Sequence, residues 1–208
     1  MSKTVYIDLD GTLTDPYEGI TKCICYALER LGEPTPSADV LQTTIGPPLV
    51  DTFAPLVGEE RTPKALEYYR ERFSDIGWLE NIPYDGIHDV LETLNVAGHQ
   101  CFVATTKPHV FARRIVEHFE MAQYFSGVYG SELDGTRTDK TELLKYAQAE
   151  RATRRESIMI GDRHHGERLG PFGRGHAVEP GRFHLDAQNP MFFQDIEQRF
   201  VRNVEHVG

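Results

Sequence analysis

Two aspartates, Asp8 and Asp10, stand where a short apolar run at 5–7 ends in a glycine turn. Alternation along a strand points both carboxylates to the same side, and Gly11 lets the backbone turn directly after them. Adjacent carboxylates repel each other, so the pairing costs free energy unless a cation or a reaction uses it. The other interpretation is a strand-end turn in which aspartates cap backbone donors.

More polar side chains follow other expected strands. A strand predicted at 100–104 ends in Thr-Thr-Lys at 105–107, and one predicted at 157–160 ends in Gly-Asp at 161–162. In an open α/β sheet, ligands collect beyond the carboxyl ends of the strands. Lys140 falls in the first turn of a predicted helix, where the helix dipole disfavours a cation. A lysine at this position therefore suggests that it contacts an anion. Taken singly, Lys140 also suits a solvated surface, and a strand-end threonine hydroxyl also suits a bond to backbone.

The elements that must position these groups alternate between strand and helix. This order predicts an α/β fold, a Rossmann-like parallel sheet with helices on both faces. Asp139 and Glu142 have the spacing of a capping box at the start of one helix. The expected strands are 5–7, 100–104, 125–129 and 157–160, and the expected helices are 86–97, 108–119 and 139–149.

The stretch 16–83 differs, because it shows only helical periodicities. One of its expected helices carries Leu66, Tyr69 and Phe73 on a single stripe. A helical block inserted after the first strand is typical of a separate cap domain. We therefore expect a catalytic core made of 1–15 and 84–208 and a cap at 16–83. The expected cap helices are 20–31, 40–45, 49–57 and 63–76.

Composition narrows the class of protein. The 208 residues are 39% hydrophobic and 26% charged, and no apolar run is long enough to span a bilayer. The net charge of -10 argues against a nucleic-acid partner and requires a local cation wherever a phosphate binds. Cys23, Cys25 and Cys101 lie inside apolar patterns, which favours reduced core thiols over disulfides or a metal site. No signal-peptide pattern precedes the first strand, so a cytoplasmic location is expected.

In chain order, these segments resemble the haloacid dehalogenase superfamily of hydrolases with a helical cap, most closely its phosphoglycolate phosphatase and 5′-nucleotidase-like branch. The signature segments are DLDGT at 8–12, VATTKP at 103–108, Lys140 and IMIGD at 158–162. Two further segments, IGPPL at 45–49 and GSELDGTR at 130–137, also resemble that branch. The likeness extends from Thr4 to about His165.

The resemblance implies a Mg²⁺-dependent phosphomonoesterase that acts on a small phosphorylated metabolite. Asp8 would attack phosphorus and become an aspartyl-phosphate, while Asp10 would act as general acid and then general base. Thr105 and Lys140 would hold the transferring phosphoryl group. Mg²⁺ would be bound by the Asp8 carboxylate, the Asp10 carbonyl and Asp162. The expected substrate-binding residues are Gly11, Thr12, Thr106, Lys107, Gly46 and Pro47, in a monomer or a homodimer with no membrane or nucleic-acid partner.

One position departs from the family pattern. Members usually carry a second acid four or five residues after the Gly-Asp aspartate; Gly166 stands at the first spacing and Glu167 at the second. Glu167 is therefore expected to support the metal. From Gly166 onward, glycine and proline dominate, which predicts loop or disorder, with a helix-like end at 192–201.

Two other functions stay open at this point. One is a sugar phosphomutase, although that branch usually has a histidine where Ile20 stands. The other is a catalytically weakened phosphate-binding or interaction protein, which Gly166 and the unusual tail make credible.

Overall fold

The computed structural model describes residues 3–151 and 157–161, and the chain divides into two compact units. Unit 1 is formed by Met1–Thr14 with Pro83–Gly208, and unit 2 is Asp15–Ile82. No helix in the described part of the chain is long and apolar enough to cross a membrane.

Unit 1 is built around a four-stranded parallel sheet with the order β5-β4-β1-β6. Its strands are β1 (Thr4–Ile7), β4 (Gln100–Pro108), β5 (Val128–Ser131) and β6 (Ser157–Ile160). All four residues of β1 are buried, because β1 pairs with β4 on one side and with β6 on the other. A parallel strand buried in this way is expected to be continuously apolar, and the Val-Tyr-Ile run fits that expectation.

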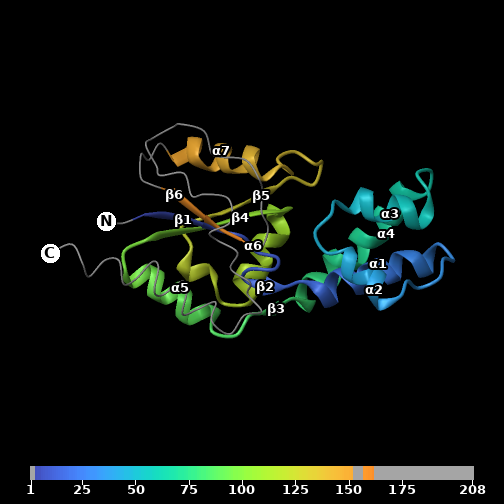
Figure 1. Cartoon of the computed structure of the whole chain (residues 1–208), viewed down its shortest axis with the longest axis horizontal. Coiled ribbons are helices and arrows are strands. Elements are labelled where there is room, and N and C mark those ends of the chain that lie inside the picture. Colours follow the sequence, from blue (N-terminus) through green and yellow to red (C-terminus); the bar gives the residue numbers. More distant parts are fainter. Residues whose placement is uncertain (1–2, 152–156, 162–208) are drawn as a thin grey trace. The chain divides into compact units, whose positions relative to one another are not determined.

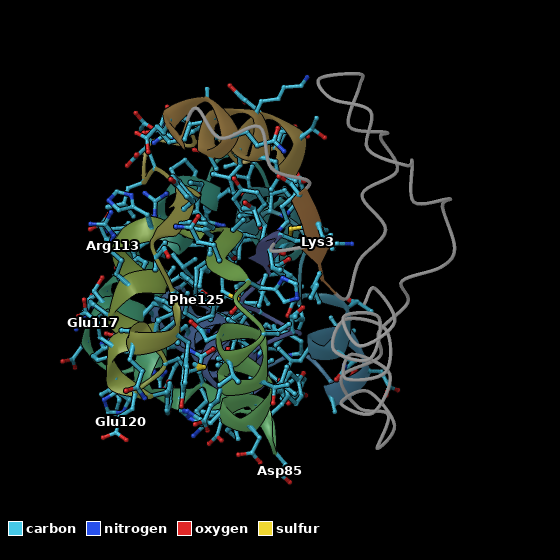
Figure 2. The ribbon with its side chains drawn as sticks, turned by 90° about the vertical axis from the view of Figure 1, so that its left-hand side faces the viewer. Lys3, Asp85, Arg113, Glu117, Glu120 and Phe125 are labelled. Atoms are coloured by element: carbon cyan, nitrogen blue, oxygen red, sulfur yellow. The ribbon has the colours of Figure 1, made fainter. Side chains whose placement is uncertain are left out.

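Helices cover both faces of this sheet. The helix α7 (Lys140–Arg151) lies over one face, and α5 (Ile87–Val96) and α6 (His109–His118) lie over the other (Figure 1). The buried sides of α5 and α6 carry the apolar residues expected from helical spacing, while Arg113 and Glu117 point outward from α6 (Figure 2). On the α7 side, a core cluster joins the sheet to the helix through Tyr6, Phe102, Ala104, Leu144 and Ala147.

Unit 2 is helical. It contains α1 (Tyr17–Arg30), α2 (Ala38–Thr43), α3 (Leu49–Val57), α4 (Thr62–Asp75) and the 3-10 turn η1 (Gly77–Glu80). The α1 helix lies against η1 so closely that a Cβ on Gly19 would be 2.3 Å from the Gly77 carbonyl oxygen. Glycine is therefore required there by sterics. Arg72 donates two hydrogen bonds to Glu80, of 2.6 and 3.0 Å, which hold the pKa of Glu80 below its usual value.

The two segments that connect the units pair with each other. They form β2 (Thr14–Asp15) and β3 (Ile82–Pro83), a two-stranded sheet that the helical pattern of 16–83 did not predict. The chain passes from unit 1 to unit 2 between Thr14 and Asp15, and back between Ile82 and Pro83. That unit 2 acts as a cap stays a prediction.

Most expected elements are confirmed, with three corrections. The strand at 157–160 has the predicted bounds, whereas β4 continues to Pro108. The strand β5 begins at Val128 rather than at 125, because the 3-10 turn η2 (Ala122–Tyr124) ends just before Phe125. On α4, the buried stripe uses Ala65 with Tyr69 and Phe73, and Leu66 is half-buried. The loop predicted from 166 onward and the helix predicted at 192–201 lie outside the described residues.

Candidate active site

Those predicted site residues of unit 1 that the structure describes gather at the carboxyl edge of its sheet. Since all four strands are parallel, their carboxyl ends lie at one edge. Asp8 follows β1, Thr105 and Lys107 lie in the last part of β4, Ser131 ends β5 and Gly161 follows β6. This edge is where open α/β sheets bind their ligands.

Asp8 is buried, with 8% of its surface exposed, and its carboxylate is fixed from two sides. The Leu9 N–H donates to Asp8 Oδ1 at 2.8 Å, and Lys140 Nζ lies 2.6 Å from Asp8 Oδ2. Asp8 is also tied to the neighbouring strand, because its own N–H donates to the Ile160 carbonyl oxygen at 2.9 Å. The Asp8 side chain is thereby held in place with one cation beside it.

Lys140 is the first residue of α7, and only 5% of it is exposed. Besides Asp8, its ammonium donates to the Ala104 carbonyl oxygen at 2.8 Å. Asp139, just before it, accepts the Glu142 N–H at 2.8 Å, which is the predicted cap of this helix. Among the described residues, the Asp8 carboxylate is thus an anion that Lys140 contacts, and its contact with a phosphoryl group stays a prediction.

The segment after Asp8 makes a tight turn that carries Asp10. Gly11 has φ of 79°, a left-handed conformation that favours glycine. The Leu9 carbonyl oxygen accepts three N–H groups, those of Thr12 at 3.3 Å, Leu13 at 2.9 Å and Thr14 at 3.0 Å. Thr12 is buried inside this turn. The turn places Asp10 beyond the end of the sheet, with part of its side chain reachable from solvent.

The Asp10 carboxylate is paired with Lys107. Lys107 Nζ lies 2.9 Å from Asp10 Oδ1 and 2.8 Å from Asp10 Oδ2. Lys107 lies within a register shift of β4: Ala104 pairs with Tyr129 and Pro108 with Ser131, so four residue steps on β4 match two on β5. Bulges of this kind bend a strand and re-aim its side chains, and they are common next to active sites.

The bulged segment is tightly supported. Thr105 is 1% exposed, and its Oγ1 accepts the Lys107 N–H at 3.2 Å. Ser131 donates to the Thr106 carbonyl oxygen at 2.8 Å, while the Thr106 side chain is exposed. A Cβ on Gly130 would be 2.6 Å from the Lys107 carbonyl oxygen and 2.7 Å from His109 Cα. Gly130 and Ser131, which belong to the GSELDGTR segment, thus support the site from β5.

The loop between β5 and α7 is cross-linked by charge. Glu132 contacts His109 Nδ1 at 3.1 Å and also pairs with Arg137 Nη2. Arg137 has φ of 62° and lies over the Tyr146 ring at 4.4 Å. The Thr136 N–H donates to Asp134 and holds the pKa of that carboxyl below its usual value. These contacts fix the loop that leads to Lys140.

Two ion pairs therefore stand side by side at the sheet edge, Asp8 with Lys140 and Asp10 with Lys107. Their four formal charges cancel, so these residues add nothing to the net charge of -10.

The donors at this edge suit a hard cation. Asp8 and Asp10 offer only oxygen atoms, the ligands that Mg²⁺ prefers. Within 3–151 and 157–161, no group of three or more His, Cys, Asp or Glu side chains is arranged to hold a metal ion. The two further predicted ligands, Asp162 and Glu167, lie outside the described residues. Gly161 does approach Asp8, since a Cβ there would be 3.4 Å from Asp8 Cβ.

Gly46 and Pro47, the remaining predicted substrate-binding residues, belong to unit 2. They lie in the loop between α2 and α3, where Gly46 has φ of 106°. Their part in binding substrate stays a prediction. What sequence reasoning did not find is that the Lys107 ammonium contacts Asp10; the only signal was its place two residues after Thr105, at the same strand end.

Comparison with known proteins identifies the family to which a chain with this fold and these residues at the sheet edge belongs. Residues 5–170 match the family model described as haloacid dehalogenase-like hydrolase, and the chain belongs to that family. It is 48% identical over 164 residues to a 5′-nucleotidase of Pseudomonas aeruginosa, covering 77% of this chain and 74% of the relative.

Two other similarities extend the comparison. The chain is 38% identical over 162 residues to the tyrosine-protein kinase PtkA of Mycobacterium tuberculosis, covering 77% of this chain and 56% of that protein. A crystal structure of a phosphatase from Clostridium difficile, described as putative in its name, superposes with a TM-score of 0.71 and 42% identity. That match covers 78% of this chain and 77% of the other.

Proposed function

We propose that this phosphatase hydrolyses phosphomonoesters of small metabolites by transferring the phosphoryl group to Asp8. The observation that carries the proposal is the pair of ion pairs at one sheet edge, in which a buried carboxylate and a more exposed one each have their own lysine. One carboxylate is held rigidly, as a nucleophile requires, and the other retains access to solvent, as a group that exchanges protons requires.

The first half of the reaction forms the covalent intermediate. An Asp8 carboxylate oxygen attacks phosphorus, the bond from phosphorus to the ester oxygen breaks, and the protonated Asp10 gives its proton to the departing oxygen. Lys140 and Thr105 would hold phosphoryl oxygens. The contact between Lys140 and Asp8 also reduces the repulsion between the carboxylate and an incoming phosphate dianion.

The second half regenerates the enzyme. The Asp10 carboxylate takes a proton from water, the water oxygen attacks the phosphorus of the aspartyl-phosphate, and the bond from phosphorus to Asp8 breaks. Inorganic phosphate and the free Asp8 carboxylate result, and Asp10 is protonated again. The proton given up in the first half is thus recovered from water.

Mg²⁺ is the cofactor that the oxygen donors fit best. The Asp8 carboxylate and the Asp10 carbonyl would hold it, together with Asp162 and with Glu167 in support. When bound, it supplies positive charge to the phosphoryl oxygens.

Unit 2 is proposed to act as the cap that selects the substrate. Its loop between α2 and α3, with Gly46 and Pro47, is the proposed contact to the part of the substrate that leaves. The relative at 48% identity is named a 5′-nucleotidase, which makes nucleoside 5′-monophosphates the first substrates to test. Phosphoglycolate and sugar phosphates are the next.

The test is hydrolysis of p-nitrophenyl phosphate and of this substrate panel, with Mg²⁺, by the parent protein and by Asp8→Asn. We expect the variant to lose at least about a thousandfold in turnover while its circular dichroism stays that of the parent, because it lacks the attacking charge. Substrate labelled on phosphorus should leave acid-stable label on the parent and none on the variant. Appreciable turnover by a pure Asp8→Asn preparation would contradict the covalent route.

A further inference from the structure

We propose that Lys107 is a positioning residue, whose ammonium holds the Asp10 carboxylate in the orientation that both proton transfers need. The inference rests on the proposed function, because it concerns Asp10 as acid and base. It gives Lys107 a role different from the direct substrate binding expected from the sequence.

The contact itself is two-pronged. Lys107 Nζ reaches both oxygens of Asp10, at 2.9 and 2.8 Å, so rotation of the carboxylate would break at least one hydrogen bond. The Lys107 side chain is 6% exposed, whereas that of Asp10 is 24% exposed. A buried ammonium thus holds a carboxylate that solvent still reaches, and a carboxylate that is both fixed and accessible suits a group that must exchange protons with a leaving group and with water.

The main chain around Lys107 is fixed independently of Asp10. Its N–H is bonded to Thr105 Oγ1, and its carbonyl oxygen is approached by Gly130 so closely that no side chain fits there. Lys107 therefore starts from a rigid backbone position at the bulge of β4. The turn that carries Asp10 has a left-handed glycine directly after it, and a long-range contact from a rigid strand limits the motion of such a turn.

Two roles for Lys107 make different kinetic predictions. If it acts through Asp10, its loss should matter only where Asp10 is needed. If it binds phosphate directly, its loss should weaken every phosphoryl transfer alike. The leaving group separates these cases, because 4-nitrophenol is acidic enough to depart as its anion, whereas a simple alkoxide requires a proton.

The experiment compares p-nitrophenyl phosphate with ethyl phosphate in the presence of Mg²⁺. For Lys107→Met, kcat/KM on ethyl phosphate should fall about a hundredfold, the scale of lost general acid catalysis, and kcat/KM on p-nitrophenyl phosphate should fall only a few-fold. The second half-reaction also needs Asp10, so this variant should release a burst of nitrophenol equal to the enzyme present and accumulate phosphoenzyme. Equal loss on both substrates, without a burst, would overturn the proposal.

A double-mutant cycle adds an independent test. If Lys107 acts through Asp10, Lys107→Met should have little further effect on kcat/KM for ethyl phosphate in an Asp10→Asn background. Multiplied losses in the double variant would show that Lys107 works independently and would overturn the proposal.

Two more variants complete the design. Lys145→Met makes the same chemical change at an exposed position of α7 and should leave both substrates unaffected. Lys107→Arg keeps a cation with a different shape, so its kcat/KM on ethyl phosphate should lie between those of Lys107→Met and the parent. If Lys107→Met does not fold, Lys107→Arg replaces it in the test. Its loss relative to the parent should then be confined to ethyl phosphate. Failure of the proposed function would look different, because the parent itself would then hydrolyse neither ester and carry no label.

Discussion

Lys140 joins Asp8, the proposed nucleophile, to the neighbouring strand: its ammonium lies 2.6 Å from Asp8 Oδ2 and 2.8 Å from the Ala104 carbonyl oxygen. Little of either side chain is exposed: 5% of the Lys140 side chain and 12% of the Asp8 side chain. A buried charge without a partner is costly, so each of these residues needs the other for the fold as well as for the proposed reaction. We therefore expect stability and the proposed catalysis to be coupled at this pair.

Lys140→Met should lower the free energy of unfolding by about 3 kcal/mol, because it leaves the buried Asp8 carboxylate without its cation. Asp8→Asn should also destabilise the protein, and the double variant should lose less than the two single losses combined. Urea denaturation of the four proteins, followed by circular dichroism, measures the cycle. Strict additivity would mean that the pair is not coupled in solution.

A surface pair provides the control for this cycle. Lys64 and Glu67 form an exposed ion pair on α4 at 2.8 Å. Exposed pairs contribute little to stability, so Lys64→Met should leave the urea midpoint nearly unchanged.

Gly130→Ala should destabilise unit 1 by about 1–3 kcal/mol and lower activity on any substrate, because its Cβ would meet backbone atoms of Lys107 and His109. Relief of that overlap requires the bulged segment of β4 to move, and Asp10 is held from this segment. Gly127→Ala is the matched control, since a Cβ there makes only ordinary contact with the Phe102 ring, at 3.5 Å. Thermal melting and p-nitrophenyl phosphate turnover of both variants test the prediction. Equal effects would mean that the close approach at Gly130 is not rigid.

Much of unit 1 was predictable, because a buried parallel strand is a continuous apolar run and its end is marked by polar residues. The strand 157–160 and the cap Asp139 follow from such local patterns. The start of β5 could not be predicted from such a pattern. Residues 126 and 127 already bond to β4, through the Ser126 N–H and the Gly127 carbonyl oxygen, but regular pairing begins only at Val128.

The positions of Asp8 and Thr105 at this sheet edge could be predicted because both lie at the carboxyl ends of strands, and that of Lys140 because it begins a helix. The partner of Lys107 could not be found in this way, because it depends on the register shift of β4, which is a property of the paired strands and not of the local sequence. Gly130 argued against a strand in the sequence, since a glycine ordinarily weakens one. Its place in β5 is explained by the close approach of the Lys107 and His109 backbone.

Removal of divalent cations should abolish turnover, and Mg²⁺ or Mn²⁺ should restore it, because Asp8 and Asp10 offer only oxygen donors. Ca²⁺ is larger and prefers more ligands, so it should inhibit by displacing the phosphoryl group from the line of attack. Turnover after EDTA treatment and stepwise addition of each ion measures this. Full activity in excess EDTA would contradict the proposed cofactor, and circular dichroism in EDTA checks that the fold is intact.

Alkaline pH should weaken the fold through Cys101, which lies in β4 and is 1% exposed. Burial disfavours the thiolate and raises the pKa of Cys101 from 9.0 to about 11. The unfolded chain therefore loses this proton first, and between these values the folded state binds more protons than the unfolded one. The contribution of the protonated Cys101 thiol to the free energy of unfolding is fully present below pH 9 and decreases as the pH rises toward 11. Relative to Cys101→Ala, which cannot titrate there, the parent should lose about 2 kcal/mol across this window. Parallel urea titrations from pH 8 upward measure the difference, and identical pH profiles for the two proteins would show that the buried thiol has no such effect.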